Sequence, residues 1–227
     1  GGMGMGPVEG MVVMEELGRG MVLEPLNQAL IAGGVLSGYA PDALKTEWLP
    51  RIAAGDALVV LASQERRARY RLDACDAKAT QSSFGWSLTA TKNVVPVGDQ
   101  ADAFLVPATV NGAVALFLVA RGASGVSTRG YGTQDGGRAA DLILQNAPAS
   151  LITTDGLAAL ELAEDIGIAA TCAEAVGVMD KTVDLTAEYL NTRKQFGVPI
   201  GSFQALRHRA ADMKMQLELA RSMSYYA

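Results

Sequence analysis

The chain has 227 residues, of which 49% are hydrophobic and 19% are charged, and its formal net charge is −5 at pH 7. This composition supplies enough apolar material for a folded core of one or two domains. The acidic balance argues against a nucleic-acid-binding protein, because no basic face outweighs the acids. The longest apolar run, 113–120, is far shorter than the ~20 residues of a membrane-spanning helix, so we expect a soluble globular protein with no membrane segment.

The first residues and the cysteines bear on where the protein resides. The segment 1–6 lacks the basic start and the long apolar core of a secretory signal. The two cysteines, Cys75 and Cys172, are far apart in the sequence and belong to no paired motif. We therefore expect reduced, buried thiols and a cytoplasmic location.

Helical patterns fill the first fifty-odd residues. Apolar residues at helical spacing predict helices over 8–17 and 23–35, the second with Pro25 in its first turn. Pro41 can occupy the first turn of a third helix, which Gly55 ends. The apolar positions of this third helix are Leu44, Trp48 and Ile52.

From Asp56 onward the pattern is that of strands. The apolar run 58–62 suits a buried strand, and Asn111-Gly112 is a hairpin turn signal. Further strands are predicted over 86–90, 103–106, 114–119 and 141–144. The central third is therefore predicted to be a small antiparallel sheet domain.

Helix returns at Asp155, which is suited to be an N-cap. Small residues in the helical stretch 157–192 would let neighbouring helices approach closely: Ala169, Ala170, Ala173, Ala175 and Gly177. After Pro199, apolar or small residues recur three and four positions apart, which predicts a buried helix-bundle seam. The seam consists of Phe203, Leu206, Ala210, Met213, Leu217 and Ala220.

The junction between these last two helices carries the most specific motif. It includes Tyr189, Arg193, Phe196-Gly197, Pro199-Ile200 and Phe203-Gln204. This order resembles the acyl-CoA dehydrogenase family, whose C-terminal helical domain carries Tyr-(x)3-Arg-x-x-Phe-Gly-x-Pro-Ile-(x)2-Phe-Gln. In that family the Arg and the Phe reach into the neighbouring subunit and bind the pyrophosphate region of its FAD. The resemblance therefore implies FAD-binding roles for Arg193 and Phe196, with Gln195 between them.

The order helix, sheet, helix is also that of acyl-CoA dehydrogenases. The resemblance implies an α+β multi-domain fold with three parts: the remainder of an N-terminal helical domain (1–56), a middle antiparallel β-domain (57–152) and the first half of a C-terminal helical bundle (153–227). About half of a typical family member would then be covered. We expect the sequence to be a fragment of a longer chain, with its C-terminal bundle truncated.

Acyl-CoA dehydrogenation needs a carboxylate base beside the α-carbon of the thioester and a flavin that accepts the β-hydrogen as hydride. In most of the family that Glu lies beyond the position of residue 227. A minority of members place it near the position of Gly167. Glu164 and Asp165 lie about one helical turn earlier and are better explained as solvated residues. The catalytic base is therefore left unknown.

The segments that face the flavin in the family depart from the family pattern here. Members show Thr-Glu-Pro and then a Gly-Ser-Asp turn where this chain has 63–70; the Gly-Ser pair is gone, and Ser63 keeps a hydroxyl at the first position. Members show Trp-Ile-Thr where this chain has 94–96, and proline brings neither a hydroxyl nor an N–H donor. Lys92 supports the alignment. The candidate cofactor-binding residues in this part are Ser63, Val95 and Pro96.

Three interpretations follow. The chain could bind its own FAD by altered contacts, in a self-sufficient homo-oligomer. It could instead be the supporting subunit of a heteromer and donate Arg193 and Phe196 to the FAD of its partner. The runs 172–180 and 193–201 resemble the small subunit of a two-chain, pimeloyl-CoA-type bacterial enzyme, which favours the second interpretation. The third is a non-enzymatic scaffold that keeps the fold. The implied partners are an acyl-CoA substrate, a homologous subunit or a second copy, and an electron-accepting flavoprotein.

Two groups of basic residues remain. A dense cluster could contact CoA phosphates or an acidic partner, or could be a solvated loop; it consists of Arg66, Arg67, Arg69 and Arg71. His208, the only histidine, lies in a helix without a paired nucleophile or a second ligand. No metal site is therefore predicted.

Overall fold

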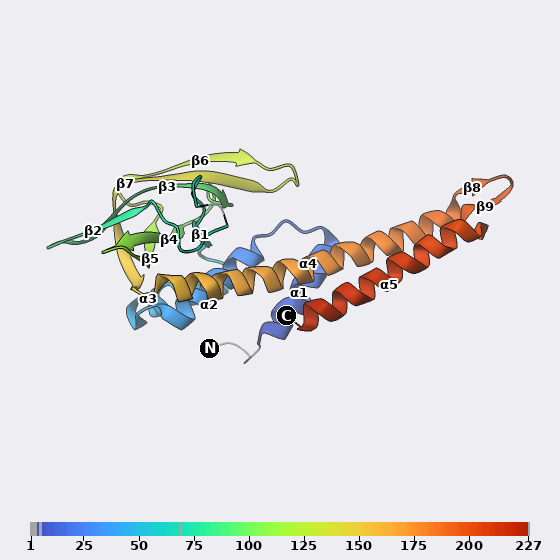
Figure 1. Cartoon of the computed structure of the whole chain (residues 1–227), viewed down its shortest axis with the longest axis horizontal. Coiled ribbons are helices and arrows are strands. Elements are labelled where there is room, and N and C mark those ends of the chain that lie inside the picture. The colour runs from blue at the N-terminus through green and yellow to red at the C-terminus, as the bar shows by residue number, and fades with distance from the viewer. Residues whose placement is uncertain (1–3, 5, 69, 227) are drawn as a thin grey trace. The chain divides into compact units, whose positions relative to one another are not determined.

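The computed structural model describes residue 4, residues 6–68 and residues 70–226 (Figure 1). Arg69 of the basic cluster and most of the segment 1–6 lie outside the described residues. The helices are α1 (Pro7–Gly20), α2 (Leu26–Tyr39), α3 (Asp42–Ala54), α4 (Gly156–Thr192), the short 3-10 helix η1 (Ile200–Ser202) and α5 (Gln204–Tyr226). The strands are β1 (Val59–Leu61), β2 (Lys78–Ser82), β3 (Gly85–Pro96), β4 (Ala103–Val110), β5 (Ala113–Ala120), β6 (Val126–Gly132), β7 (Arg138–Thr153), β8 (Lys194–Gln195) and β9 (Val198–Pro199).

The chain divides into two compact units. One consists of Pro25–Gly167 and holds α2, α3, the strands β1 to β7 and the beginning of α4. The other consists of Gly1–Glu24 and Ile168–Ala227 and holds α1, the rest of α4, β8, β9, η1 and α5. The predicted order of helices, sheet and helices is confirmed. The three-domain boundaries at 56 and 152 stay a prediction.

The three predicted N-terminal helices are present, and α3 ends at Gly55 as the sequence suggested. Pro25 and Pro41 each precede a helix as its N-cap, so neither occupies the first turn as predicted. Both positions suit proline, because the residue before a helix needs no N–H for an intrahelical bond. Gly55 ends α3 in the left-handed conformation, with φ of 77°. This is the C-terminal position at which glycine costs least.

The strands β1 to β7 form one sheet in the order β1-β4-β2-β3-β7-β5, with β6 paired to β7. Because β4 also pairs with β5, the strands β4, β2, β3, β7 and β5 close into a ring. The prediction of an antiparallel sheet holds for most pairs, but β1 and β2 each run parallel to β4. Strands β2 and β6 were not predicted, because their side chains are mostly exposed and lack an apolar signal.

The β4–β5 hairpin follows the prediction closely. Asn111 and Gly112 join the strands with φ of 49° and 85°. Two positive φ values in a two-residue loop match the twist of the paired strands, and Asn-Gly is the dipeptide that adopts them most readily. Register is fixed from Ala103 opposite Ala120 to Val110 opposite Ala113.

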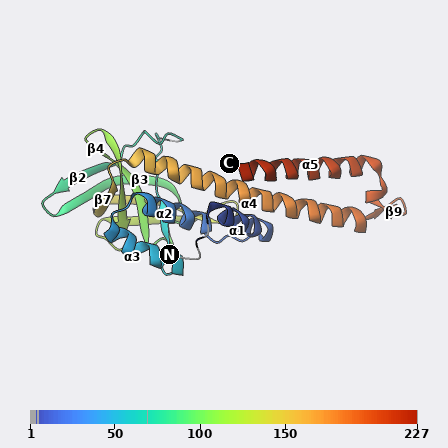
Figure 2. The ribbon, with the colours of Figure 1, turned by 90° about the horizontal axis from the view of Figure 1, so that it is seen from below.

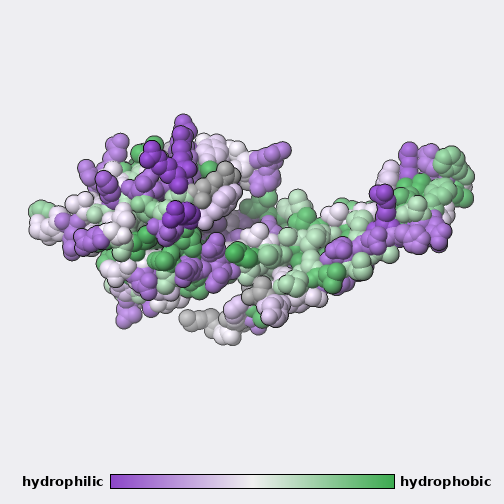
Figure 3. All heavy atoms as spheres, viewed as in Figure 1, coloured by the Kyte–Doolittle hydropathy of each residue, from purple (hydrophilic) through white to green (hydrophobic). Residues whose placement is uncertain are grey.

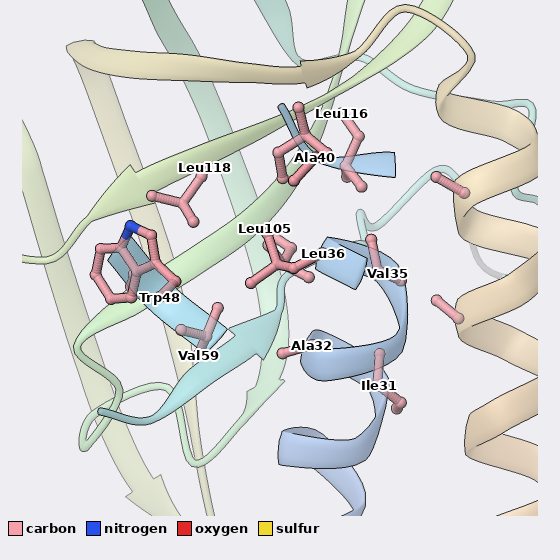
Figure 4. Packing of buried hydrophobic residues seen from close by; sticks show 14 of the residues in the cluster. Ile31, Ala32, Val35, Leu36, Ala40, Trp48, Val59, Leu105, Leu116 and Leu118 are labelled. Carbon is pink, nitrogen blue, oxygen red and sulfur yellow. The ribbon is translucent and has the colours of Figure 1, made fainter. Parts of the chain in front are cut away.

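The core of the larger unit joins its helices to one face of the sheet. Figure 4 shows the side chain of Leu36 on α2 beside Leu105 of β4, in a buried cluster that also contains Ile31, Val35 and Leu116. The helix α4 adds three small or apolar residues to the same cluster: Ala159, Leu160 and Ala163. Each fully buried large apolar side chain contributes roughly 1.5–3 kcal/mol, so this cluster anchors the beginning of α4.

In the other unit, α1 and α4 pack at the distance that only glycine allows. A Cβ atom on Gly177 would overlap the carbonyl oxygen of Glu15, and one on Gly18 would overlap the carbonyl oxygen of Glu174. Beside this contact a charged network crosses three helices. Arg19 pairs with Asp180, while Arg221 reaches Glu15 at 3.1 Å and Asp180 at 3.3 Å. The predicted close approach at the small residues of α4 is therefore present at Gly177.

The α5 helix runs antiparallel to α4 beyond the β8–β9 turn (Figure 2). The predicted seam has the right period, because Leu206, Ala210, Met213 and Ala220 are half-buried and Leu217 is fully buried. The prediction that the whole seam is buried is wrong for Phe203, which is 37% exposed. Cys172 is also exposed, contrary to the expectation of buried thiols, and Cys75 is half-buried.

We expect Gly177→Ala to lower the free energy of unfolding by about 1–3 kcal/mol, since its methyl group has no room against α1 and overpacking is costly. Alanine is otherwise the better helix former, by about 1 kcal/mol. The matched control is Gly33→Ala in α2, where no described atom beyond its chain neighbours and the backbone of its own helix lies within 4 Å of the Cβ position. Urea denaturation of both variants measures the difference. Equal or higher stability of Gly177→Ala would contradict the close approach.

We expect Met213→Asp to destabilise the helical unit, because it places a charge on the half-buried seam between Ala210 and Leu217. The expected loss in the free energy of unfolding is about 1–3 kcal/mol, since the half-buried site leaves the new carboxylate partly in contact with water. Met215, two residues on and exposed, provides the control Met215→Asp. Thermal melting that falls equally in both variants would show that the seam does not pack as described.

Candidate functional site

The candidate residues fall into two groups that belong to different units. Ser63, Val95 and Pro96 lie in the unit that contains the sheet, and Arg193, Gln195 and Phe196 lie in the helical unit. The first group follows β1 and ends β3, and the second forms the connection between α4 and α5.

The structure brings the first group together. Ser63, Val95 and Pro96 line a pocket of about 130 Å³. The other lining residues come from α2, from β1 and from the neighbours of the three in sequence: Gln28, Ile31, Leu61, Gln64, Asn93 and Val94. An adjoining hollow of about 450 Å³ shares Gln64, Asn93 and Val94 with the pocket and extends to Arg66 and Tyr70. The pocket therefore opens along the loop that follows β1.

A β-bulge shapes one wall of the pocket. The register of β3 against β7 shifts between Lys92 and Val95, and Val94 and Val97 have φ of 51° and 45°. A β-branched residue rarely adopts such a conformation, and local strain of this kind clusters at functional sites. The bulge turns Val94 outward, where it is 51% exposed, while the side chain of Val95 is buried in the sheet core. Val95 therefore offers its backbone to the pocket rather than its side chain.

A buried ion pair lies behind the same wall. The Lys92 ammonium contacts the Glu65 carboxylate at 2.6 Å, and the two side chains are 0% and 5% exposed. Burial works to raise the pKa of the Glu65 carboxyl, but the hydrogen bond and charge of Lys92 and the amides of Asp76 and Ala77 together lower that pKa. This pair was not predicted from the sequence. The signal was available, because Leu88, Ala90 and Lys92 alternate along the inward face of β3.

Gln28 is a second residue that the sequence analysis missed. Gln28 lies at the pocket, and its side-chain oxygen is buried with no hydrogen-bond partner among the residues that the structure describes. Gln28 precedes Ile31, Ala32 and Val35 by three, four and seven residues, so it interrupts the apolar face of α2. A polar residue on such a face is the signal that could have identified it. An unpaired buried oxygen fits a hydrogen-bond donor in the pocket.

A larger hollow of about 740 Å³ lies over β3 and β7 and contains charges of both signs. Arg129 pairs with Asp141 at 3.0 Å. The Asn93 amide and the Arg129 guanidinium lower the pKa of the Asp141 carboxyl, with Asn93 the stronger influence. Within the described part of the chain, the side chains of Arg66 and Arg67 have no hydrogen bond or ion pair. These two arginines are therefore available to an anion.

The second group lies on a small hairpin. Gln195 pairs with Val198, and Phe196 and Gly197 form the turn with φ of 52° and 79°. Phe196 is 90% exposed and contacts Phe203 edge to face, with ring centroids 6.0 Å apart. Hydrophobic residues lie among hydrophilic ones at this end of the helices (Figure 3).

Hydrogen bonds hold the backbone of Arg193 in place, whereas its side chain is exposed. Its N–H donates to the Tyr189 carbonyl at 2.9 Å, and its carbonyl accepts from the Ile200 N–H at 2.8 Å. Its exposed guanidinium has no partner among the described residues. The junction therefore presents a cation and an aromatic ring to the surroundings.

The carboxylates considered as catalytic bases and the possibility of a metal site can also be examined in the described residues. Glu164 and Asp165 are exposed on α4. Within residues 4, 6–68 and 70–226, no three His, Cys, Asp or Glu side chains are grouped to hold a metal ion. None of the described helices is long and apolar enough to cross a membrane.

Comparison with known proteins defines the class. Residues 1–56 match the family described as acyl-CoA dehydrogenase, N-terminal domain, and residues 155–227 match acyl-CoA dehydrogenase, C-terminal domain. The fold is that of an acyl-CoA dehydrogenase. The solved glutaryl-coenzyme A dehydrogenase in complex with glutaryl-CoA superposes with a TM-score of 0.95 at 25% identity, over 100% of this chain and 62% of that one. The chain belongs to the acyl-CoA dehydrogenase family.

Individual relatives extend the comparison. Acyl-CoA dehydrogenase FadE27 of Mycobacterium tuberculosis is 32% identical over 93% of this chain and 56% of its own length. A variant of the Tcur3481-Tcur3483 steroid ACAD has a TM-score of 0.89 at 32% identity, over 99% of this chain and 61% of that one. The ChsE4-ChsE5 complex from Mycobacterium tuberculosis has a TM-score of 0.86 at 29% identity, over 98% and 60%. The chain thus spans little more than half the length of FadE27.

Proposed function

We propose that this chain is a subunit of an FAD-dependent acyl-CoA dehydrogenase that acts on the α,β-bond of an acyl-CoA thioester. Within that enzyme it is the supporting subunit of a heteromer, and Arg193 and Phe196, with Gln195, contact the FAD of its partner. FAD supplies the hydride acceptor when bound. The single observation that carries the proposal is the junction, where an unpaired guanidinium and an exposed ring stand on a fixed hairpin.

The residues of the junction fit a phosphate-bearing cofactor. A guanidinium pairs with phosphate through charge-assisted hydrogen bonds, and Arg193 has no competing partner within the described residues. Phe196 can cover the cofactor and keep water from this contact. Two of the similar structures are named as pairs of different proteins, Tcur3481-Tcur3483 and ChsE4-ChsE5, which supports a heteromer.

The pocket beside Ser63 fits FAD less well by itself. Its volume of about 130 Å³ is below the ~300–1,000 Å³ of common ligand pockets. Pro96 has no N–H to donate, and Val95 turns its side chain into the core. These features favour a supporting role over a self-sufficient enzyme.

A second candidate function has its own observation. The unpaired oxygen of Gln28, the hydroxyl of Ser63 and the unpaired Arg66 and Arg67 could together bind FAD in this chain's own pocket. The chain would then be an enzyme that forms homo-oligomers. A non-enzymatic scaffold remains a third possibility without a feature of its own. An electron-accepting flavoprotein as partner rests on the resemblance alone.

We expect Arg193→Ala to lower FAD retention in the assembled oligomer about ten- to a hundredfold, since a charge-assisted bond to phosphate contributes roughly 1.5–3 kcal/mol. Lys194→Ala is the matched control, because it removes one positive charge from the neighbouring exposed position. Flavin absorbance at about 450 nm after gel filtration measures retention. Unchanged flavin content and affinity in Arg193→Ala would remove this role.

We expect the chain alone to purify without stoichiometric FAD and to be inactive on acyl-CoA. Each lost hydrogen bond to the flavin costs on the order of 1 kcal/mol, and two or three losses weaken binding roughly ten- to several hundredfold. Co-expression with the homologous partner should give a heteromer with fewer flavins than chains. A homo-oligomer with one FAD per chain, bound against Val94 to Pro96, would favour the second candidate function instead.

A further inference from the structure

The buried ion pair between Lys92 and Glu65 is difficult to explain as a device for stability. Lys92 is among the largest fully buried side chains, and among the described residues its ion-pair partner is the Glu65 carboxylate at 2.6 Å. Removing both charges from water costs about as much as their attraction returns, so an apolar pair of similar volume would serve the fold as well or better. The pair is therefore better explained by what it holds in place.

The pair joins the two segments that form the candidate pocket. Glu65 lies in the loop after β1, two residues beyond Ser63, and it also accepts the N–H groups of Asp76 at 2.6 Å and Ala77 at 3.1 Å. Lys92 lies in β3 immediately before the bulge. Next to the pair, the Asn93 N–H donates to the Gln64 carbonyl at 2.9 Å. One ion pair and one backbone hydrogen bond thus connect the two walls.

The bulge itself needs such support. Val94 has a φ of 51°, and a strained residue persists only where its neighbours are fixed on both sides. On the far side of the bulge, the Val97 N–H donates to the Arg138 carbonyl at 2.8 Å. On the near side, Asn93 donates through its side-chain amide to Asp141 at 3.1 Å. Lys92 adds the anchor that lies inside the sheet.

The half-buried Cys75 also contacts the ion pair, and its thiol does not disturb the pairing. Its sulfur lies 3.6 Å from Glu65 Oε1 and 3.8 Å from Lys92 Nζ. Burial raises the pKa of this thiol, so the sulfur stays neutral and does not compete for the ammonium. The carboxylate of Glu65 is therefore the charge that holds Lys92.

We infer that Lys92 and Glu65 are positioning residues of the candidate pocket: their ion pair holds the loop at Ser63–Gln64 against the bulge at Asn93–Val94. The inference rests on the proposed function only for the identity of the ligand. The contact between the two walls of the pocket is a property of this chain alone, so it can be measured without a ligand.

The test compares three variants of the full chain. Lys92→Met leaves the Glu65 carboxylate buried and unpaired and should lower the melting temperature. The double variant Lys92→Met/Glu65→Gln removes both charges and keeps one acceptor oxygen, so one of the two hydrogen bonds from the amides of Asp76 and Ala77 is retained. Arg71→Met breaks the exposed Arg71–Asp73 pair in the same loop and serves as control. Hydrogen exchange at the Asn93 amide reports contact between the walls.

In the double variant we expect melting within a few degrees of the parent chain but exchange at the Asn93 amide about tenfold faster. The control should change neither. Unchanged Asn93 exchange in the double variant would overturn the inference. A double variant that melts as low as Lys92→Met would also overturn it, because the pair would then act mainly in stability.

Titration of each variant with FAD separates this inference from the proposed function. If the parent chain has residual affinity for FAD, the double variant should bind about tenfold more weakly and the control should match the parent. If the parent chain binds no FAD, the pocket has a different ligand or none. The exchange measurement still decides the positioning role in that case.

Discussion

The small residues along α4 are the constraint on which both units of the chain depend. In the larger unit, Ala159 and Ala163 bring the beginning of this helix against the hydrophobic cluster that joins α2 to the sheet. In the other unit, Gly177 lies against the backbone of α1, where no side chain fits. Close helix packing gains dispersion energy but tolerates no added volume. The side chains on the packed faces of α4 are therefore limited in size in both units.

Local signals explain why the order of elements could be predicted. Pro41 and Gly55 bracket α3, and Asn111-Gly112 forms the predicted hairpin turn, since each of these residues restricts or permits particular φ values by its own chemistry. The junction motif was likewise readable, because its residues are adjacent in sequence. It could identify the family but not the exposure of each side chain.

The features that escaped prediction depend on residues far apart in the chain. The parallel pairing of β1 with β4 joins residues about forty positions apart, and nothing in either segment specifies the direction of the partner. The bulge at Val94 is defined by the register of β3 against β7, which is distant in sequence. The Lys92–Glu65 pair likewise joins β3 to the loop after β1. For the candidate pocket, the sequence therefore identified Ser63, Val95 and Pro96 but neither Gln28 nor the ion pair behind them.

Phe196 is the clearest example of a residue that the fold alone does not require. A two-residue turn with both φ values positive is formed most easily by Asn-Gly or Gly-Gly, and an aromatic residue at its first position costs on the order of 1 kcal/mol. The ring is also 90% exposed, so most of its apolar surface contributes nothing to the stability of the isolated chain. Two unfavourable choices at one position conflict with local propensity, and such conflicts occur where function sets the residue. A binding surface completed by another molecule would offset both costs, which is why the exposed ring beside the unpaired Arg193 supports a role outside the chain's own core.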